Sequence, residues 1–184
     1  MSTLYVLGGA TGAGKTTWYR YGIEKESISR EMPFINIDVF ILRDLDDYLP
    51  LLQQKGDLLI ESNLSNAEDY DWIDSLRKRG YETVLFFFGT NSAEINKSRI
   101  KSRLLEGGHD IAGPIVEQRY YRSLAYLKRK LTDFTEATLI DVSGHKPLVM
   151  ARLKMGRVLF TASKLMPWVK ESLQMVESLE SYSR

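Results

Sequence analysis

The run Gly9-Ala10-Thr11-Gly12-Ala13-Gly14-Lys15-Thr16 matches the pattern G-x-x-x-x-G-K-[ST] at every fixed position. Its residue types suit the binding of a polyphosphate. Glycine has no Cβ to block close approach and tolerates positive φ, so backbone N–H groups can surround an anion. A lysine adds a mobile positive charge for the β- and γ-phosphates, and a threonine hydroxyl can ligate Mg²⁺. The run therefore predicts a loop that binds a nucleoside triphosphate, ATP, together with Mg²⁺.

The sequence on either side of this loop supports the prediction. Apolar residues at 4–7 predict a strand before it, and an amphipathic segment from about Gly14 predicts a helix whose N-terminus faces the phosphates. A glycine-rich turn followed by a chance Lys-Thr is the alternative, and it would not need this strand and helix. We expect the nucleotide to contact Gly9, Thr11, Gly12, Ala13, Gly14, Lys15, Thr16 and Thr17, with Thr16 also in the metal site. Guanine specificity is unsupported, since Asn96-Lys97-Ser98-Arg99 lacks the aspartate of N-K-x-D.

Two acidic residues follow predicted strands. Asp38 comes directly after the strand predicted at 34–37, and Glu61 follows the apolar run at 58–60. The carboxyl ends of parallel strands form the ligand crevice in an α/β sheet. A carboxylate at the position of Asp38 could accept a proton from an attacking hydroxyl, although Asp38 could instead cap a helix. Glu61 could hold Mg²⁺ or bind the acceptor, or it could be an ordinary surface glutamate.

Arginines lie on two predicted helices joined by a glycine-containing segment. Arg99 and Arg103 are four residues apart and share a helix face, and Arg119 and Arg122 lie on the next helix. Between them is Gly107-Gly108-His109-Asp110, which predicts a hinge. Such a pair of helices could close over a phosphoryl group, with at least one arginine acting on it. The alternative for each single arginine is a solvated surface charge.

The elements that must position these residues alternate between strands and helices. Further strands are predicted at 84–88 and 138–140, and helices at 66–79, at about 92–106 and from Pro114. This alternation predicts an α/β fold: a five-stranded, mainly parallel sheet with helices on both faces. A hairpin at 148–161 and a helix from about Pro167 are expected as a C-terminal accessory at about 146–184. We therefore expect one domain, 1–184, with a helical lid at about 93–133.

The composition narrows the functional classes. The 184 residues contain no cysteine, which excludes disulfides, thiolate metal sites and cysteine nucleophiles. A formal net charge of +1 gives no overall attraction to nucleic acid or membranes. The aromatic stretch at 120–127, with Lys128-Arg129-Lys130 after it, could form a nucleic-acid surface, but a core-facing helix with a solvated basic end is favoured. No apolar run approaches the roughly 20 residues of a membrane span, so we expect a soluble, cytoplasmic protein.

Taken together, these motifs resemble those of the zeta-toxin-like P-loop kinases. The resemblance rests on the phosphate loop, on Asn36-Ile37-Asp38, on the segment 59–65, and above all on Gly107-Gly108-His109-Asp110-Ile111 followed by Arg119-Tyr120. It extends over roughly residues 4–168 and implies phosphorylation of a hydroxyl on UDP-N-acetylglucosamine or a related sugar nucleotide. It also implies that Lys15 contacts the ATP phosphates, Asp38 is the general base, Glu61 belongs to the metal or acceptor site, and Arg119 with Arg103 stabilises the transferred phosphoryl.

This sequence departs from the family pattern near the expected acceptor site. Only 22 residues separate Asp38 from Glu61, and Ala112 replaces the usual proline after the Gly-Gly-His-Asp-Ile run. The acceptor therefore stays open between a UDP-sugar and another small metabolite, a nucleotide or an RNA end. An ATP-binding regulatory protein that signals to a partner is the remaining alternative, and an antitoxin or other protein partner is left open as well.

Overall fold

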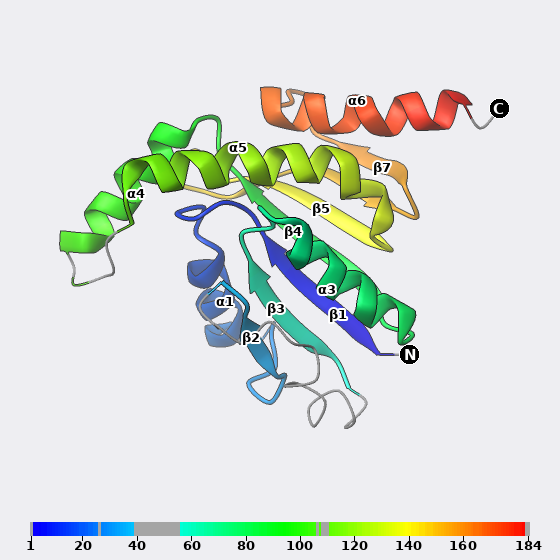
Figure 1. The fold of residues 1–184 in the computed structure, drawn as a ribbon, viewed down its shortest axis with the longest axis horizontal. Helices are drawn as coiled ribbons and strands as arrows, with labels where there is room; N and C mark the ends of the chain where they lie inside the picture. The colour runs from blue at the N-terminus through cyan, green and yellow to red at the C-terminus, as the bar shows by residue number, and fades with distance from the viewer. Residues whose placement is uncertain (1, 26, 39–55, 106, 108–110, 183–184) are drawn as a thin grey trace.

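The computed structural model describes residues 2–25, 27–38, 56–105, 107 and 111–182, and side chains as far as Val176. Its strands form one sheet in the order β2-β3-β1-β4-β5-β6-β7 (Figure 1). The strand bounds are β1 Thr3–Gly8, β2 Phe34–Asn36, β3 Leu58–Ser62, β4 Glu82–Gly89, β5 Glu136–Asp141, β6 Leu148–Lys154 and β7 Arg157–Thr161. The helices are α1 Lys15–Glu24, α3 Ala67–Lys78, α4 Ala93–Leu105, α5 Gly113–Lys130, the 3₁₀ turn η2 Leu131–Asp133 and α6 Pro167–Tyr182.

The first five strands in this order are parallel, as the alternating sequence predicts. β1 lies at the centre, between β3 and β4. Leu4 and Val6 belong to one apolar cluster, whereas Leu7 belongs to another on the opposite face of the sheet. The strand is apolar on both faces because helices cover both faces. The loop after β1 therefore starts from a fixed position at the carboxyl end of the sheet.

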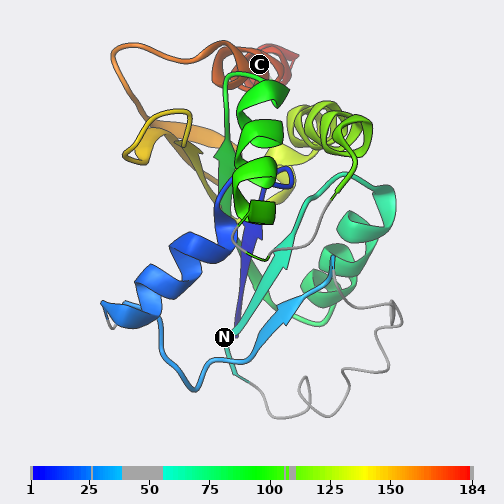
Figure 2. The same ribbon diagram turned by 90° about the vertical axis from the view of Figure 1, so that its left-hand side faces the viewer.

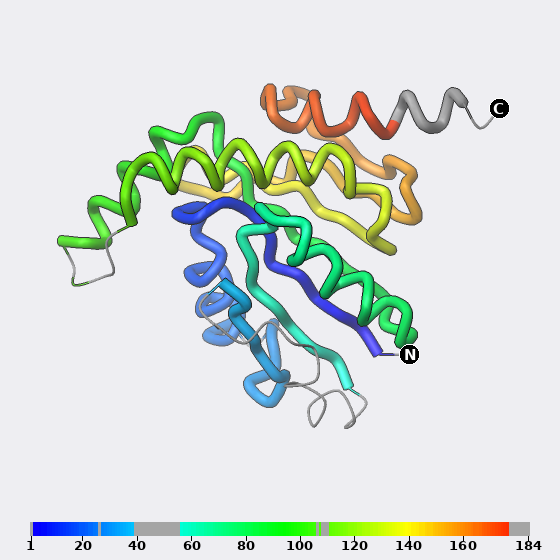
Figure 3. The backbone as a smooth tube through the Cα atoms, in the orientation of Figure 1, coloured from blue at the N-terminus to red at the C-terminus, as the bar shows by residue number. Residues whose placement is uncertain are grey.

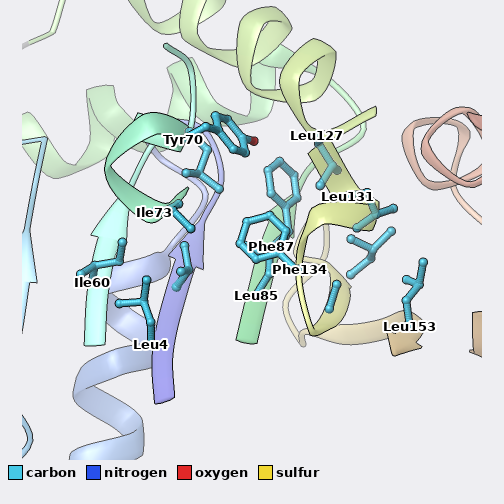
Figure 4. Packing of buried hydrophobic residues seen from close by; sticks show 14 of the residues in the cluster. Leu4, Ile60, Tyr70, Ile73, Leu85, Phe87, Leu127, Leu131, Phe134 and Leu153 are labelled. Atoms are coloured by element: carbon cyan, nitrogen blue, oxygen red, sulfur yellow. The ribbon is translucent and has the colours of Figure 1, made fainter. Parts of the chain in front are cut away.

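The larger cluster lies between the sheet and helices α3, α5 and α6. Figure 4 shows Tyr70 and Ile73 of α3, and Leu127 of α5, packed over strand residues such as Ile60 and Phe87. The other face is covered by α1, which packs around Leu7, Leu59 and Phe88. The predicted α/β fold with helices on both faces is confirmed.

The C-terminal hairpin extends the main sheet, whereas the sequence predicts an accessory beside a five-stranded sheet. β6 pairs antiparallel with β5, and β7 pairs antiparallel with β6, which gives seven strands among the described residues. The turn between them places Met155 at φ 50° and Gly156 at φ 73°, the positive values of a tight hairpin turn. Met150, Ala151 and Leu153 of β6 are buried in the larger cluster. Pairing with β5 and this burial make the hairpin part of the same core.

Helices α4 and α5 project beyond the sheet at the end where β1 leads into α1 (Figures 1 and 2). The backbone trace shows α5 returning from there along the sheet, with α6 beside it (Figure 3). Tyr120 and Leu127 are buried, while Lys128 pairs with Glu171 and Lys130 with Asp133, so α5 is the expected core helix with a polar basic end. Within the described ranges, no helix is long and apolar enough to cross a membrane.

Candidate active site

The loop between β1 and α1 takes a shape that only glycine accommodates at some positions. Gly9 has φ 131°, and a Cβ built on it would lie 2.2 Å from the Phe88 backbone oxygen. Gly14 has φ 87° and forms the N-cap of α1. A residue with a side chain would be strained at both positions. The loop therefore presents backbone at the N-terminus of α1, where peptide dipoles favour an anion.

Lys15 is the buried cation of this loop, with a side-chain exposure of 5%. Its Nζ donates to the Gly9 backbone oxygen at 2.5 Å and to Asn63 Oδ1 at 3.1 Å. Burial lowers the pKa of Lys15, while the nearby carboxylates of Asp38 and Glu61 oppose this effect. Among the described residues the ammonium donates these two hydrogen bonds, and its third proton can be donated to a phosphate oxygen.

Thr16 and Glu61 form a pair of hard oxygen ligands beside Lys15. The Thr16 hydroxyl lies 2.9 Å from each carboxylate oxygen of Glu61. Glu61 is 5% exposed and belongs to β3 itself, one residue before the end of the strand. Mg²⁺ is typically held in proteins by one or two such oxygens together with phosphate oxygens and waters. The pair fits that ion, and among the described residues no group of three or more His, Asp or Glu forms a separate metal site.

Asp38 lies at the carboxyl end of β2, next to the loop that follows β3. Its Oδ1 accepts the backbone N–H of Asn63 at 2.9 Å, and its own N–H donates to Asn36 Oδ1 at 3.0 Å. The side chain is exposed. The expected alternative, in which Asp38 caps a helix, concerns residues 39–42, which lie outside the described residues.

Asp69 is a second carboxylate on the same side of the sheet, in the first turn of α3. Its Oδ2 accepts the Ser65 N–H at 3.2 Å. Burial, and then the charge of Asp38, raise its pKa above the ordinary range. Asp38 therefore lies near a second carboxylate, that of Asp69, and near the positive charge of Lys15.

Helices α4 and α5 both hold the loop through Thr11. Asn96 of α4 is 1% exposed, and its Nδ2 donates to the Thr11 backbone oxygen at 2.7 Å. Arg119 of α5 donates from Nη1 to the Thr11 hydroxyl at 3.1 Å. Arg99 of α4 donates to the Val142 backbone oxygen, just beyond β5. Arg119 is therefore brought to the phosphate loop.

The other residues singled out from the sequence divide into two groups. Arg103 and Arg122 are exposed and, among the described residues, make no hydrogen bond or ion pair with the loop. Thr17 is exposed on α1, and its expected nucleotide contact stays a prediction, as do those of Gly12 and Ala13. Gly108, His109 and Asp110 lie outside the described residues, whereas Gly107 has φ 87° and closes the end of α4.

Sequence reasoning did not identify Asn63 and Asn96 as site residues. Asn63 lies within the segment that carries the family resemblance, two residues after Glu61, but a single asparagine in a loop gives no signal of its own. Asn96 lies in the run that lacks the aspartate of the guanine-binding motif, and this pattern does not indicate a contact with the phosphate loop. Both are buried amides, and their hydrogen bonds to the phosphate loop, from Asn63 to Lys15 and from Asn96 to Thr11, join residues 48 and 85 positions apart, so only the tertiary fold reveals them.

Comparison with known proteins concerns the fold of the chain. No family model matches the chain. A 61-residue stretch is 39% identical to an uncharacterised protein of Haemophilus influenzae. The stretch covers 33% of this chain and 44% of that protein. A solved structure of the AvrRxo1-ORF1:AvrRxo1-ORF2 complex aligns over 94% of this chain and 64% of that chain, with a TM-score of 0.65 and 13% identity. One structure of that complex was determined with ATP.

A structure from the PezAT chromosomal toxin–antitoxin system of Streptococcus pneumoniae aligns over almost the full length of both chains. The alignment covers 99% of this chain and 87% of that one, with a TM-score of 0.61 and 18% identity. This chain thus spans less than half of the curated relative and about two thirds of the AvrRxo1 chains. At these identities the likeness concerns the fold, and at that level it confirms the resemblance drawn from the motifs. The chain shares its fold with the AvrRxo1 and PezAT structures, and this is the fold that the motif resemblance implies.

Proposed function

We propose that this protein is an ATP-dependent kinase that transfers the γ-phosphoryl of ATP to a hydroxyl group. The observation that carries the proposal is that Lys15 and Asp38 both bond to Asn63 at the carboxyl end of the sheet, with the carboxylate of the Thr16–Glu61 pair close enough to act on Lys15. A phosphate loop alone would support only nucleotide binding. A carboxylate held beside it supplies what a hydroxyl acceptor needs.

The step joins the acceptor oxygen to the γ-phosphorus of ATP and breaks the bond between that phosphorus and the β–γ bridging oxygen. Asp38 takes the proton of the acceptor hydroxyl, and ADP leaves with the bonding electrons. Lys15 and Arg119 bind the phosphate oxygens and offset their negative charge. Thr16 and Glu61 would hold Mg²⁺, which when bound neutralises phosphate charge. Arg103 of α4 is proposed as a further member of this clamp.

The acceptor is proposed to be a UDP-sugar, with UDP-N-acetylglucosamine as the first candidate. Support for this acceptor comes from the motif resemblance. Another small metabolite, a nucleotide or an RNA end would use the same base and the same phosphate site.

An acceptor panel tests this function. ADP release from Mg-ATP is measured with UDP-N-acetylglucosamine, other sugar nucleotides, free sugars, nucleotides and an RNA 5′ end, with Lys15→Ala as the control. We expect one acceptor class to stimulate ADP release and to yield a phosphorylated product that the control lacks. ATP binding without stimulation by any acceptor would contradict the kinase assignment and favour the second candidate.

That second candidate is an ATP-binding protein that regulates a partner. It is favoured by two exposed apolar side chains that a partner could cover. Leu159 and Phe160 lie on the edge strand β7 and are 67% and 46% exposed. The AvrRxo1 structures contain a second protein, and PezAT is a toxin–antitoxin system. A protein partner for this chain, antitoxin-like or otherwise, is part of this alternative. Nucleotide-dependent binding of a purified partner, with no phosphorylated small molecule, would establish it.

A further inference from the structure

Asn63 occupies the point where the nucleotide loop, the α5 arginine and the acceptor-side carboxylate meet. It is 4% exposed. Its side-chain oxygen accepts from Lys15 Nζ at 3.1 Å and from the Thr11 hydroxyl at 3.0 Å, while its backbone N–H donates to Asp38. One residue thus contacts groups from the phosphate loop and from the end of β2.

The direction of each hydrogen bond in this network is fixed by chemistry. An ammonium can only donate, so the atom of Asn63 that faces Lys15 must be the amide oxygen. A guanidinium can also only donate, so the Thr11 hydroxyl accepts from Arg119 and uses its single proton on Asn63. Lys15 and Arg119 are therefore both held through the Asn63 amide oxygen, Lys15 directly and Arg119 through Thr11.

The backbone around Asn63 is held in an uncommon conformation. The next residue, Leu64, has φ 50°, a left-handed value that is rare for leucine, and its side chain is fully buried. The Leu64 N–H donates to the Ser62 hydroxyl at 2.9 Å, which holds this turn. Strain of this kind persists where the surrounding structure imposes it, and it is concentrated at functional sites. Here the turn coincides with the point from which the Asn63 N–H reaches Asp38.

We propose that Asn63 is a positioning residue that sets Lys15 and Arg119 for the terminal phosphate of a nucleoside triphosphate. The inference rests on the proposed function, because the γ-phosphate must lie next to the base that activates the acceptor. Asn63 connects the nucleotide cations to that base, so it acts at the γ end of the nucleotide. A nucleoside diphosphate lacks the γ-phosphate, so Asn63 contributes less to its binding affinity.

The test compares the affinities of Mg-ADP and of a magnesium-bound, non-hydrolysable ATP analogue by calorimetry. For Asn63→Ala we expect the analogue to bind about tenfold more weakly, the scale of a lost hydrogen bond to a charged group, with a much smaller change for ADP. Asn66→Ala is the matched control: it is the same substitution in the same loop, and the Asn66 side chain makes no capping hydrogen bond. This control should bind both nucleotides like the wild type.

Thr11→Val provides a second variant that keeps side-chain shape and leaves Lys15 bonded to Asn63. It breaks the connection to Arg119 and should also weaken binding of the analogue more than binding of ADP. This variant keeps the inference testable if Asn63→Ala fails to fold. The double variant should lose no more affinity for the ATP analogue than the weaker-binding single variant, since both substitutions act on one hydrogen-bond network. Equal losses for ADP and analogue, or no loss, would overturn the role of Asn63. Wild-type protein that binds neither nucleotide would overturn the proposed function and this inference together, so the two failures are distinct.

Discussion

At the residue scale, the pairing of Thr16 with Glu61 makes a specific prediction about magnesium. Replacing the carboxylate by an amide in Glu61→Gln keeps the shape but removes the charge that attracts the ion. We expect the Mg²⁺ concentration for half-maximal ATP turnover to rise by about tenfold or more, the effect typical of losing a partner at a metal site. Metal-free nucleotide binding should stay near the wild-type level.

The measurement is a magnesium titration of ATP turnover, with metal-free binding followed in parallel. Glu68→Gln is the control, because Glu68 is exposed in the first turn of α3. An unchanged magnesium requirement in Glu61→Gln would remove Glu61 from the metal site and leave it a role in acceptor binding.

Asp69 predicts a pH dependence of stability. Its pKa is raised in the folded protein by burial and by Asp38, so folding favours the protonated acid. The associated stability is therefore complete below the unfolded pKa, and it is lost as the pH rises through that value toward the raised one. Asp69→Asn keeps an oxygen for the Ser65 N–H and removes the charge. We expect the variant to be more stable than the wild type at pH 7 and to lose that advantage at acidic pH.

Urea unfolding at both pH values checks this expectation, with Asp71→Asn, an exposed site on the same helix, as the comparison. A variant less stable than wild type at pH 7 would show that the hydrogen bond and the helix dipole outweigh the burial of charge.

At the scale of elements, α5 carries both a loop-facing and a solvent-facing arginine. Arg119 donates to Thr11, whereas Arg122, three residues later, is exposed. In the kinase we propose, Arg119→Ala should reduce kcat about 10³-fold or more, the scale of an arginine that stabilises a transferring phosphoryl. Arg122→Ala should stay within a factor of about two, as expected for a solvated surface charge.

Steady-state kinetics on the two variants, with their stability measured alongside, separates these cases. Similar rates for the two variants would assign Arg119 only a structural role on the loop.

How far each element could be predicted depended on where its determinants lie. The strand–loop–helix unit around Lys15 is local, because its glycines, apolar residues and lysine follow one another, so its fold and chemistry could be predicted from the sequence. The parallel sheet followed from apolar runs at regular intervals. The pairing of β6 with β5 could not be predicted, because antiparallel addition to an edge depends on long-range packing. Asn63 and Asn96 were missed for the same reason: each reaches the phosphate loop only through the fold.

At the scale of the whole molecule, α6 closes the core above the carboxyl ends of β4 and β5. Trp168 is 4% exposed, lies against Gly89, and its Nε1 donates to Asp141 Oδ1 at 3.3 Å. Trp168→Ala leaves a cavity and removes one hydrogen bond from Asp141 Oδ1, which still accepts from the Ser143 hydroxyl at 2.8 Å. We expect the free energy of unfolding to fall by about 3–5 kcal/mol, the usual effect of removing a buried aromatic side chain.

Urea denaturation with an unchanged m-value would show this loss, and Lys170→Ala on the exposed side of α6 should change little. A loss below about 1 kcal/mol would mean that α6 is an appendage rather than part of the core.

The central claim is phosphoryl transfer assisted by Asp38, and one measurement tests it most directly. ATP labelled in its γ-phosphate is mixed with UDP-N-acetylglucosamine and Mg²⁺, and label in the acceptor is followed in a single turnover for wild type and Asp38→Asn. Our account predicts labelled acceptor from the wild type and a loss of transfer by roughly 10²–10⁴-fold in the variant, with ATP affinity retained. Full transfer by Asp38→Asn would contradict the role of Asp38 as the base.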